Sequence, residues 1–150
     1  MDIVDTLSFL VGRWTLERLI IDHRSGTDGR FDGDAVIVEV QPGLHRPFIR
    51  RARYDESGTL HFGRHVGAAT RRLDLERMET SAVMLSFADG KPFVDLDLRD
   101  GPWRSVHACG EDEHEIVTVA QSLDVVEEHW RVRGPTQDYD AFTILRRSDH

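Results

Sequence analysis

The chain has 150 residues, of which 19 are lysine or arginine and 27 are aspartate or glutamate, and its formal net charge is −8 at pH 7. This length suits one domain with one core, and the acidic balance argues against a protein that binds nucleic acid. The sequence has no basic signal-peptide region and no run of ~20 apolar residues, so we expect a cytoplasmic protein without a membrane span. Cys109 is the single cysteine, so no internal disulfide is expected. We expect one domain over residues 1–150.

A short helix is expected near the N-terminus, from Ile3 to Leu10. Asp5 or Thr6 can cap its first turn, and Gly12 can end it. The segment resembles a lid over one end of the domain more than a long packed helix.

The first strand begins near Arg13, where the apolar pattern changes to a period of two. Trp14, Leu16 and Arg18 then share one face of an extended segment. Gly12 allows a close approach of the backbone, and Trp14 offers a large apolar ring that another element must cover. We expect the Trp14 ring to be buried against a basic residue from the last strands.

The rest of the chain alternates strand-like runs with turn residues. The turns are predicted at 25–29, 41–43, 55–58, 88–91, 100–102 and 134–138. The runs between them are Asp34–Val40, Phe48–Tyr54, Thr59–Val66, Ala69–Arg77, Ala82–Phe87, Phe93–Arg99, Arg104–Cys109, Glu115–Ser122, Glu127–Arg133 and Tyr139–Arg146. About eleven short strands at roughly 8–12-residue intervals are typical of an antiparallel sandwich or barrel.

The polar content of both strand faces favours a barrel over a sandwich. In Phe93–Arg99 the apolar residues at 94, 96 and 98 alternate with Phe93, Asp95, Asp97 and Arg99. A closed sheet around a partly hydrated lumen accommodates such strands, whereas a sandwich core needs one dry face.

Several motifs together resemble the uncharacterised domain-of-unknown-function family 6314, and the resemblance covers nearly the whole chain. They include Phe9-Leu10-x-Gly12-x-Trp14, Phe87-x-Asp89-Gly90-x-Pro92-Phe93 and Trp130-Arg131-Val132-x-Gly134-Pro135. The resemblance implies an all-β, antiparallel calycin-like barrel, of the lipocalin, fatty-acid-binding-protein or nitrobindin kind, with a short N-terminal helix. It implies no established activity.

The chain departs from the family pattern at positions that are candidates for function. Val94 stands where the family has His, His114 where an aromatic is usual, and Gln137 where Lys is usual. Residues 41–58 are longer than the pattern. Within them, Tyr54-x-Glu56-x-Gly58-x-Leu60 fits either a strand or a hairpin turn.

His107 is the first candidate for chemistry. It shares a strand face with Ser105 and Cys109, while Val106 and Ala108 occupy the other face. If the first face is internal, His107 is a catalytic acid or base, or an axial ligand of haem as in nitrobindin-like barrels. If the faces are reversed, His107 is a structural or surface residue.

Asp95 and Asp97 are the next candidates, since they share a face about 6.5–7 Å apart along a strand. Inside the barrel they form a carboxylate pair for proton transfer, with Asp95 orienting His107. On the outside they are surface acids that pair with arginines.

Two arginines, Arg71 and Arg133, are candidates for binding a ligand carboxylate. Tyr54, Trp130 and His129 complete the predicted ligand-binding set. No metal site is expected, since the histidines lack a compact ligand spacing.

Three functions follow as hypotheses. The preferred one is a barrel that binds a small apolar or amphipathic organic molecule in its lumen without a cofactor. The second is a cofactor-independent isomerase, cyclase, hydratase or lyase of a natural-product pathway. The third is a haem-binding barrel with His107 or His129 as the axial ligand. The expected partner is a small-molecule ligand or substrate, with neither nucleic acid nor membrane, and a homodimer is left open.

Overall fold

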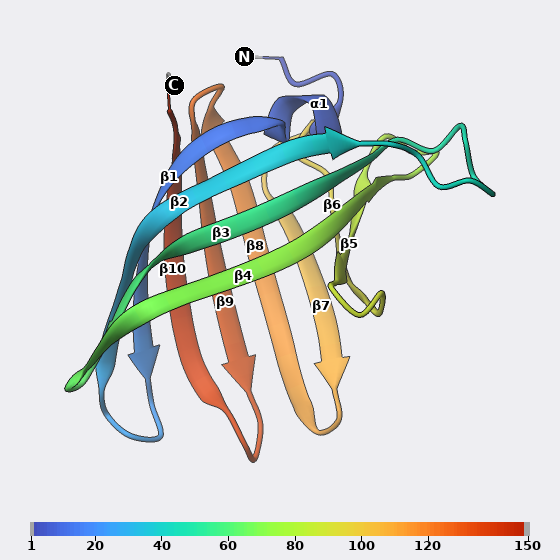
Figure 1. The fold of residues 1–150 in the computed structure, drawn as a ribbon. Helices are drawn as coiled ribbons and strands as arrows, with labels where there is room; N and C mark the ends of the chain where they lie inside the picture. Colours follow the sequence, from blue (N-terminus) through green and yellow to red (C-terminus); the bar gives the residue numbers. More distant parts are fainter. Residues whose placement is uncertain (1, 149–150) are drawn as a thin grey trace.

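The computed structural model describes residues 2–148, which form one short helix and ten antiparallel strands (Figure 1). The elements are α1 (Thr6–Leu10), β1 (Gly12–Asp22), β2 (Asp28–Val40), β3 (Arg51–Phe62), β4 (His65–Arg77), β5 (Val83–Phe87), β6 (Pro92–Leu96), β7 (Trp103–Cys109), β8 (Asp112–Ser122), β9 (Val125–Arg133) and β10 (Asp138–Arg147). Within residues 2–148 no helix has the length and apolar character needed to cross a membrane.

All ten strands belong to one sheet, in the order β6-β5-β4-β3-β2-β1-β10-β9-β8-β7. Each strand lies beside a neighbour in the chain, and β1 pairs with β10 so that the two ends of the chain meet. The sheet curls until its two edge strands, β6 and β7, lie beside each other (Figure 1). The predicted all-β, antiparallel barrel with a short N-terminal helix is confirmed.

Side chains, in place of a ladder of backbone hydrogen bonds, join β6 to β7. Trp103 Nε1 and Ser105 Oγ donate to the backbone oxygen of Asp95 at 3.1 and 2.7 Å. The same two groups reach the Asp95 carboxylate at 3.3 and 2.9 Å. These bonds satisfy polar groups on an edge that would otherwise face another strand unpaired.

Residues 55–58, which the sequence predicts to be a turn, lie inside the continuous strand β3. Gly58 pairs with Gly33 of β2, and a Cβ atom on either residue would overlap the opposite backbone. Gly58 therefore permits a close approach of two strands and does not reverse the chain. The predicted strands Phe48–Tyr54 and Thr59–Val66 are largely one strand, so the described barrel has ten strands where about eleven were expected.

The ring of Trp14 closes the barrel at the end covered by α1. It is 1% exposed, and its Nε1 donates to the Leu10 oxygen at 2.9 Å. The Arg147 guanidinium lies 4.2 Å from the centre of the Trp14 ring and donates to the backbone oxygens of Phe9 and Leu123 at 2.8 and 3.1 Å. The predicted burial of Trp14 against a basic residue of the last strand is confirmed.

Helix α1 is held by charged contacts to the sheet. Asp5 caps it by accepting from Ser8 N at 3.0 Å, as the sequence predicts. Its carboxylate also pairs with Arg50 at 3.0 Å and Arg77 at 2.7 Å. A helix of one turn is marginal alone, so these contacts and its buried apolar side chains fix its position.

Replacing Trp14 with alanine is expected to lower the free energy of unfolding by about 3–5 kcal/mol, because a large buried ring and its contact with Arg147 are lost. Urea unfolding followed by far-ultraviolet circular dichroism measures this. Phe142→Ala is the control, since Phe142 is 42% exposed, and it should cost less than about 1 kcal/mol. A loss below about 1 kcal/mol for Trp14→Ala would contradict the role of the ring in closing the barrel.

Candidate functional site

The barrel interior contains two adjoining chambers. The first, of about 70 Å³, lies beneath α1 and has mostly apolar walls, including Leu10, Leu73, Leu75 and Ile116. The second, of about 310 Å³, is more open and is lined by Arg18, Ile20, Asp22, Phe62, Arg71, Trp130, Tyr139 and Ala141. Arg18, Arg71 and Trp130 line both chambers, so these three side chains form the boundary between them.

A buried ion pair lies at this boundary. Arg18 of β1 donates to both carboxylate oxygens of Glu56 of β3, at 2.8 and 3.0 Å, and its Nε donates to Thr143 Oγ1 at 2.9 Å. The Glu56 side chain is 3% exposed, and Tyr54 Oη donates to it at 2.5 Å. The bonds from Arg18 and Tyr54 replace the water that Glu56 loses on burial.

The surroundings of Glu56 decide its protonation. Burial alone would raise the pKa of this carboxyl, but the hydrogen bond from Arg18 and the charges of Arg71 and Arg18 outweigh burial and lower the pKa below its ordinary value. For Tyr54, burial and the charge of Glu56 raise the pKa of the phenol. Glu56 is thus ionised and Tyr54 protonated at neutral pH.

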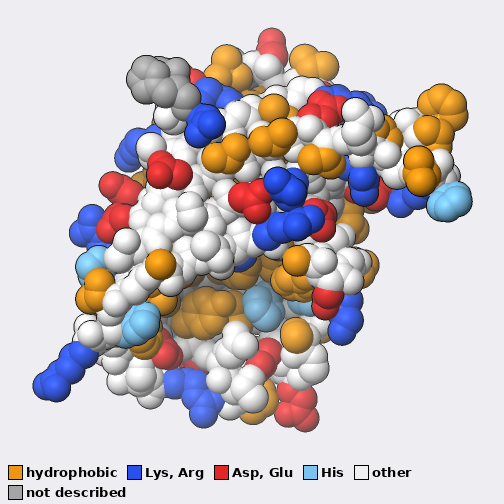
Figure 2. All heavy atoms as spheres, in the orientation of Figure 1, with side chains coloured by type: hydrophobic (Ala, Val, Ile, Leu, Met, Phe, Trp, Pro, Cys, Tyr) orange, Lys and Arg blue, Asp and Glu red, His pale blue; other side chains and the backbone are white. Residues whose placement is uncertain are grey.

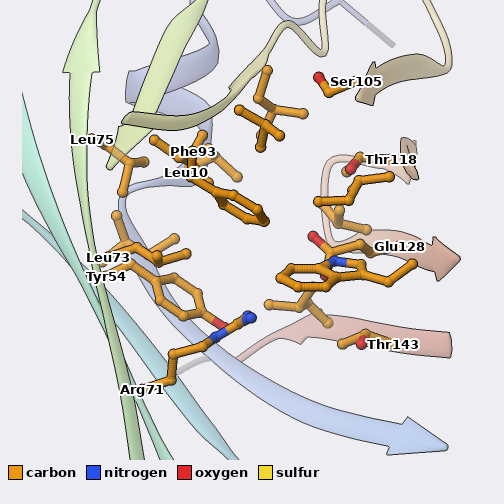
Figure 3. Close-up of a pocket in the computed structure, with 18 of the residues that line it drawn as sticks. Leu10, Tyr54, Arg71, Leu73, Leu75, Phe93, Ser105, Thr118, Glu128 and Thr143 are labelled. Carbon is orange, nitrogen blue, oxygen red and sulfur yellow. The ribbon is translucent and has the colours of Figure 1, made fainter. Parts of the chain in front are cut away.

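Arg71 of β4 lies between two aromatic rings. Its guanidinium carbon is 5.0 Å from the centre of the Trp130 ring and 5.8 Å from that of Tyr54. Its Nη2 reaches Glu56 at 3.4 Å, and its buried Nε has no hydrogen-bond partner among the described residues. Figure 3 shows Arg71 and Tyr54 on one wall of the first chamber, facing the wall that carries Thr118, Glu128 and Thr143.

The facing wall carries the remaining polar groups. Glu128 accepts from Trp130 Nε1 at 2.6 Å, and Thr118 and Thr143 are buried in β8 and β10. Asp95 and Ser105 also line the first chamber, at the seam between β6 and β7. The lumen thus combines apolar walls with a few oriented polar groups, as is usual for sites that bind organic molecules.

An aromatic and imidazole cluster borders the first chamber on the β7–β8 side. The Phe93 ring centre lies 5.2 Å from that of His107, 6.0 Å from His114 and 5.3 Å from Trp130. Burial and the charge of His107 lower the pKa of His114, so His114 is neutral at pH 7. The face of the barrel below β4 is hollowed, and hydrophobic and histidine side chains lie in the hollow (Figure 2).

Four of the predicted site residues line the lumen: Tyr54, Arg71, Asp95 and Trp130. His107 is on the inner face of β7 with Trp103 and Ser105, while Val106 is 47% exposed. The His107 ring packs on Phe93 and does not line either chamber. The Asp95 carboxylate accepts from Ser105 and Trp103, so the predicted orientation of His107 by Asp95 is not present.

Three predicted ligand-binding residues lie away from the two chambers. His129 is on the outer face of β9, where it stacks on Phe142 at 4.3 Å and bonds Asp140 at 2.7 Å. Arg133 is exposed at the end of β9. Asp97 follows the end of β6 and pairs with Arg99 at 2.7 Å, so it does not pair with Asp95.

The sequence reasoning missed Arg18, Glu56 and Glu128. Arg18 shares a face with Trp14 and Leu16, so alternation already placed it inside once Trp14 was buried. Glu128 lies two residues before Trp130 and follows by the same rule. Glu56 was assigned to a predicted turn because the Ser57-Gly58 pair that follows it is typical of turns.

Neither a cluster of metal-binding side chains nor a histidine lining a chamber is present among the described residues. Between residues 2 and 148, no group of three or more His, Cys, Asp or Glu side chains is arranged to hold a metal ion. No histidine of that range lines the first chamber. His107 and His129, the two residues predicted as axial haem ligands, line neither chamber.

These features define a class of protein, an antiparallel β-barrel with a mostly apolar internal chamber. The chain belongs to the family of unknown function DUF6314, whose model matches residues 10–147.

Two solved structures that match this chain are a natural protein and a designed one. An S-type phycobiliprotein lyase, CPES from Guillardia theta, is similar with a TM-score of 0.72 and 12% sequence identity, over 100% of this chain and 94% of that chain. A de novo designed fluorescence-activating β-barrel has a TM-score of 0.44 and 16% identity, over 97% of this chain and 100% of that chain. A comparison with curated proteins found no match.

Replacing Glu56 with glutamine is expected to lower the free energy of unfolding at neutral pH by about 3–5 kcal/mol, because Arg18 loses its charged partner inside the barrel. The pH dependence should change as well. A carboxyl whose pKa is lowered on folding stabilises the protein above its unfolded pKa, and this stabilisation is lost as the pH falls.

The unfolding free energy of the wild type should therefore fall more steeply below pH 4.5 than that of Glu56→Gln. Urea unfolding followed by tryptophan fluorescence at a series of pH values measures both slopes. Asp55→Asn, at the neighbouring exposed position, is the control. Equal slopes in the wild type and in Glu56→Gln would show that Glu56 does not titrate as described.

Proposed function

We propose that this protein binds a small apolar or amphipathic organic molecule in the lumen of its barrel. The observation that carries the proposal is the composition of the first chamber, whose apolar walls enclose a few fixed polar groups. Its apolar lining includes Ile37, Leu73, Leu75, Leu85, Val126 and Leu145. A molecule that replaces water on these walls gains the free energy of burying apolar surface.

The size of the two chambers supports a ligand that occupies both. The first chamber alone, at about 70 Å³, is narrow, whereas the second adds about 310 Å³. They meet at Arg71 and Trp130, so an elongated molecule with an apolar part under α1 would extend past these side chains toward the open chamber. Trp130 lines both chambers and adds aromatic apolar surface along this path.

The shared fold with a phycobiliprotein lyase is consistent with this proposal, because that protein has the same barrel architecture over nearly its whole length. At 12% identity the likeness concerns the fold. The choice of ligand therefore depends on the side chains of this chain's own lumen.

N-phenyl-1-naphthylamine, a neutral apolar dye whose fluorescence rises in apolar surroundings, tests the proposal. The wild type should bind it saturably at about one dye per chain. Thr118→Phe places a ring in the first chamber and should weaken binding at least about tenfold, because the space for the dye is filled.

The matched control is Val119→Phe, one position along β8 and on the opposite face, which should leave the affinity unchanged. Thermal unfolding confirms that both variants are folded. Absence of saturable binding by the wild type, or an equal loss in both variants, would refute a site in the lumen.

A further inference from the structure

We propose that the ligand carries a single acidic group, a carboxylate or sulfonate, and that Arg71 binds this group with Tyr139 as a second donor. This inference rests on the proposed function, because it names the class of molecule that the lumen takes. It follows from a difference between the two arginines at the boundary of the chambers.

Arg18 is already paired, because three of its five N–H groups donate to side chains inside the barrel and Glu56 neutralises its charge. Its guanidinium donates to both oxygens of Glu56, and its Nε donates to Thr143. Glu56 is occupied in turn, because it accepts from Arg18 and from Tyr54 at 2.5 Å. Arg18 and Glu56 therefore satisfy each other, and the pair carries no net charge.

Of the two arginines at the boundary, Arg71 is the one that remains for a ligand. Its one contact with Glu56 is long, at 3.4 Å, and reaches an oxygen that Arg18 and Tyr54 already use. Its Nε is buried without a hydrogen-bond partner among residues 2–148. A buried donor without a partner is costly, and an oxyanion beside the planar guanidinium would satisfy it with two parallel hydrogen bonds.

The aromatic neighbours hold Arg71 in position for this task. Its guanidinium lies near the rings of Trp130 and Tyr54, at 5.0 and 5.8 Å from their centres. Contacts on ring faces restrict the plane of the guanidinium while leaving its edge free to donate. Because its side chain is 30% exposed and lines both chambers, an anion can reach it from the open side.

Tyr139 supplies a second donor from β10. It lines the second chamber with Arg71. Burial raises the pKa of the Tyr139 phenol, while the charges of Arg71 and Arg18 act in the opposite direction. The phenol stays protonated at neutral pH, so it can donate to an anion in the chamber that Tyr139 lines together with Arg71.

The acids around the lumen already have partners, so the charge available for a ligand is that of Arg71. Glu128 in the first chamber accepts from Trp130 Nε1, and Asp22 in the second accepts from Ser25 Oγ at 3.0 Å and Arg24 N at 3.0 Å. These carboxylates are partnered, and Glu56 is neutralised by Arg18. A second negative charge on the ligand would be desolvated in the lumen without a further cation to pair with it, so one charge matches the single guanidinium of Arg71.

Two dyes with the same anilinonaphthalene skeleton test the inference. 8-Anilinonaphthalene-1-sulfonate differs from N-phenyl-1-naphthylamine by one sulfonate group, so the ratio of their dissociation constants isolates the acidic group. In Arg71→Gln the affinity for the sulfonate dye should fall about ten- to hundredfold more than the affinity for the neutral dye, which is the range of a lost charged hydrogen bond.

Two further variants make the result specific. Arg72→Gln removes a charge at the next position of β4, on the outer face where Arg72 pairs with Asp74, and should leave both affinities unchanged. Arg71→Lys keeps the charge without the planar fork and should lose part of the preference for the sulfonate dye. If Arg71→Gln fails to fold, the ratio of the two dye affinities in Arg71→Lys still tests the inference.

An unchanged ratio of affinities in both Arg71 variants, with binding of the neutral dye intact, would overturn the acidic-ligand inference and leave the proposed function standing. An equal fall in Arg72→Gln would overturn it too, because the effect would then come from overall charge. Failure of the wild type to bind either dye would refute both proposals.

Discussion

The ion pair between Arg18 and Glu56 is the constraint on which the interior depends. A carboxylate that is 3% exposed needs partners from several strands, and it receives them from β1 and from Tyr54 of its own strand, while Thr143 of β10 holds Arg18 in place. Replacing such a pair by apolar residues is often neutral or stabilising, so its value lies in what it organises more than in its energy. Here it divides the lumen into two chambers and leaves Arg71 without a full partner.

The two closures of the barrel differ in kind. At the helix end, Trp14 is covered by α1 and Arg147. That arginine lies over the Trp14 ring of β1 and donates to backbone oxygens of the helix and of the turn before β9. At the other closure, β6 and β7 are joined by Trp103 and Ser105 acting on Asp95. The closure at the helix end depends on a buried ring packed against a charged guanidinium, whereas the closure between β6 and β7 depends on a few hydrogen bonds.

Alternation along strands predicted much of the lumen from the sequence. Trp14, Arg71 and Trp130 lie where a period of two places them, and the same rule excludes His129 and Arg133, which are at odd separations from Trp130. Glu56 could not be found in this way, because the Gly58 that resembles a turn residue serves a close approach to Gly33 that only the folded sheet reveals. The contacts of Asp95 could not be predicted from the sequence either, because the curvature of the whole sheet decides where β6 meets β7.

The seam between β6 and β7 gives the barrel wall an uneven mechanical strength. Elsewhere each strand is held to its neighbour by a backbone ladder, whereas here the bonds converge on the single residue Asp95. Regions with few hydrogen bonds open at a lower free-energy cost than continuous ladders. We therefore expect the wall to open most readily along this line, and amide protons on the facing edges of β6 and β7 to exchange with solvent before those in β1, β2 and β3.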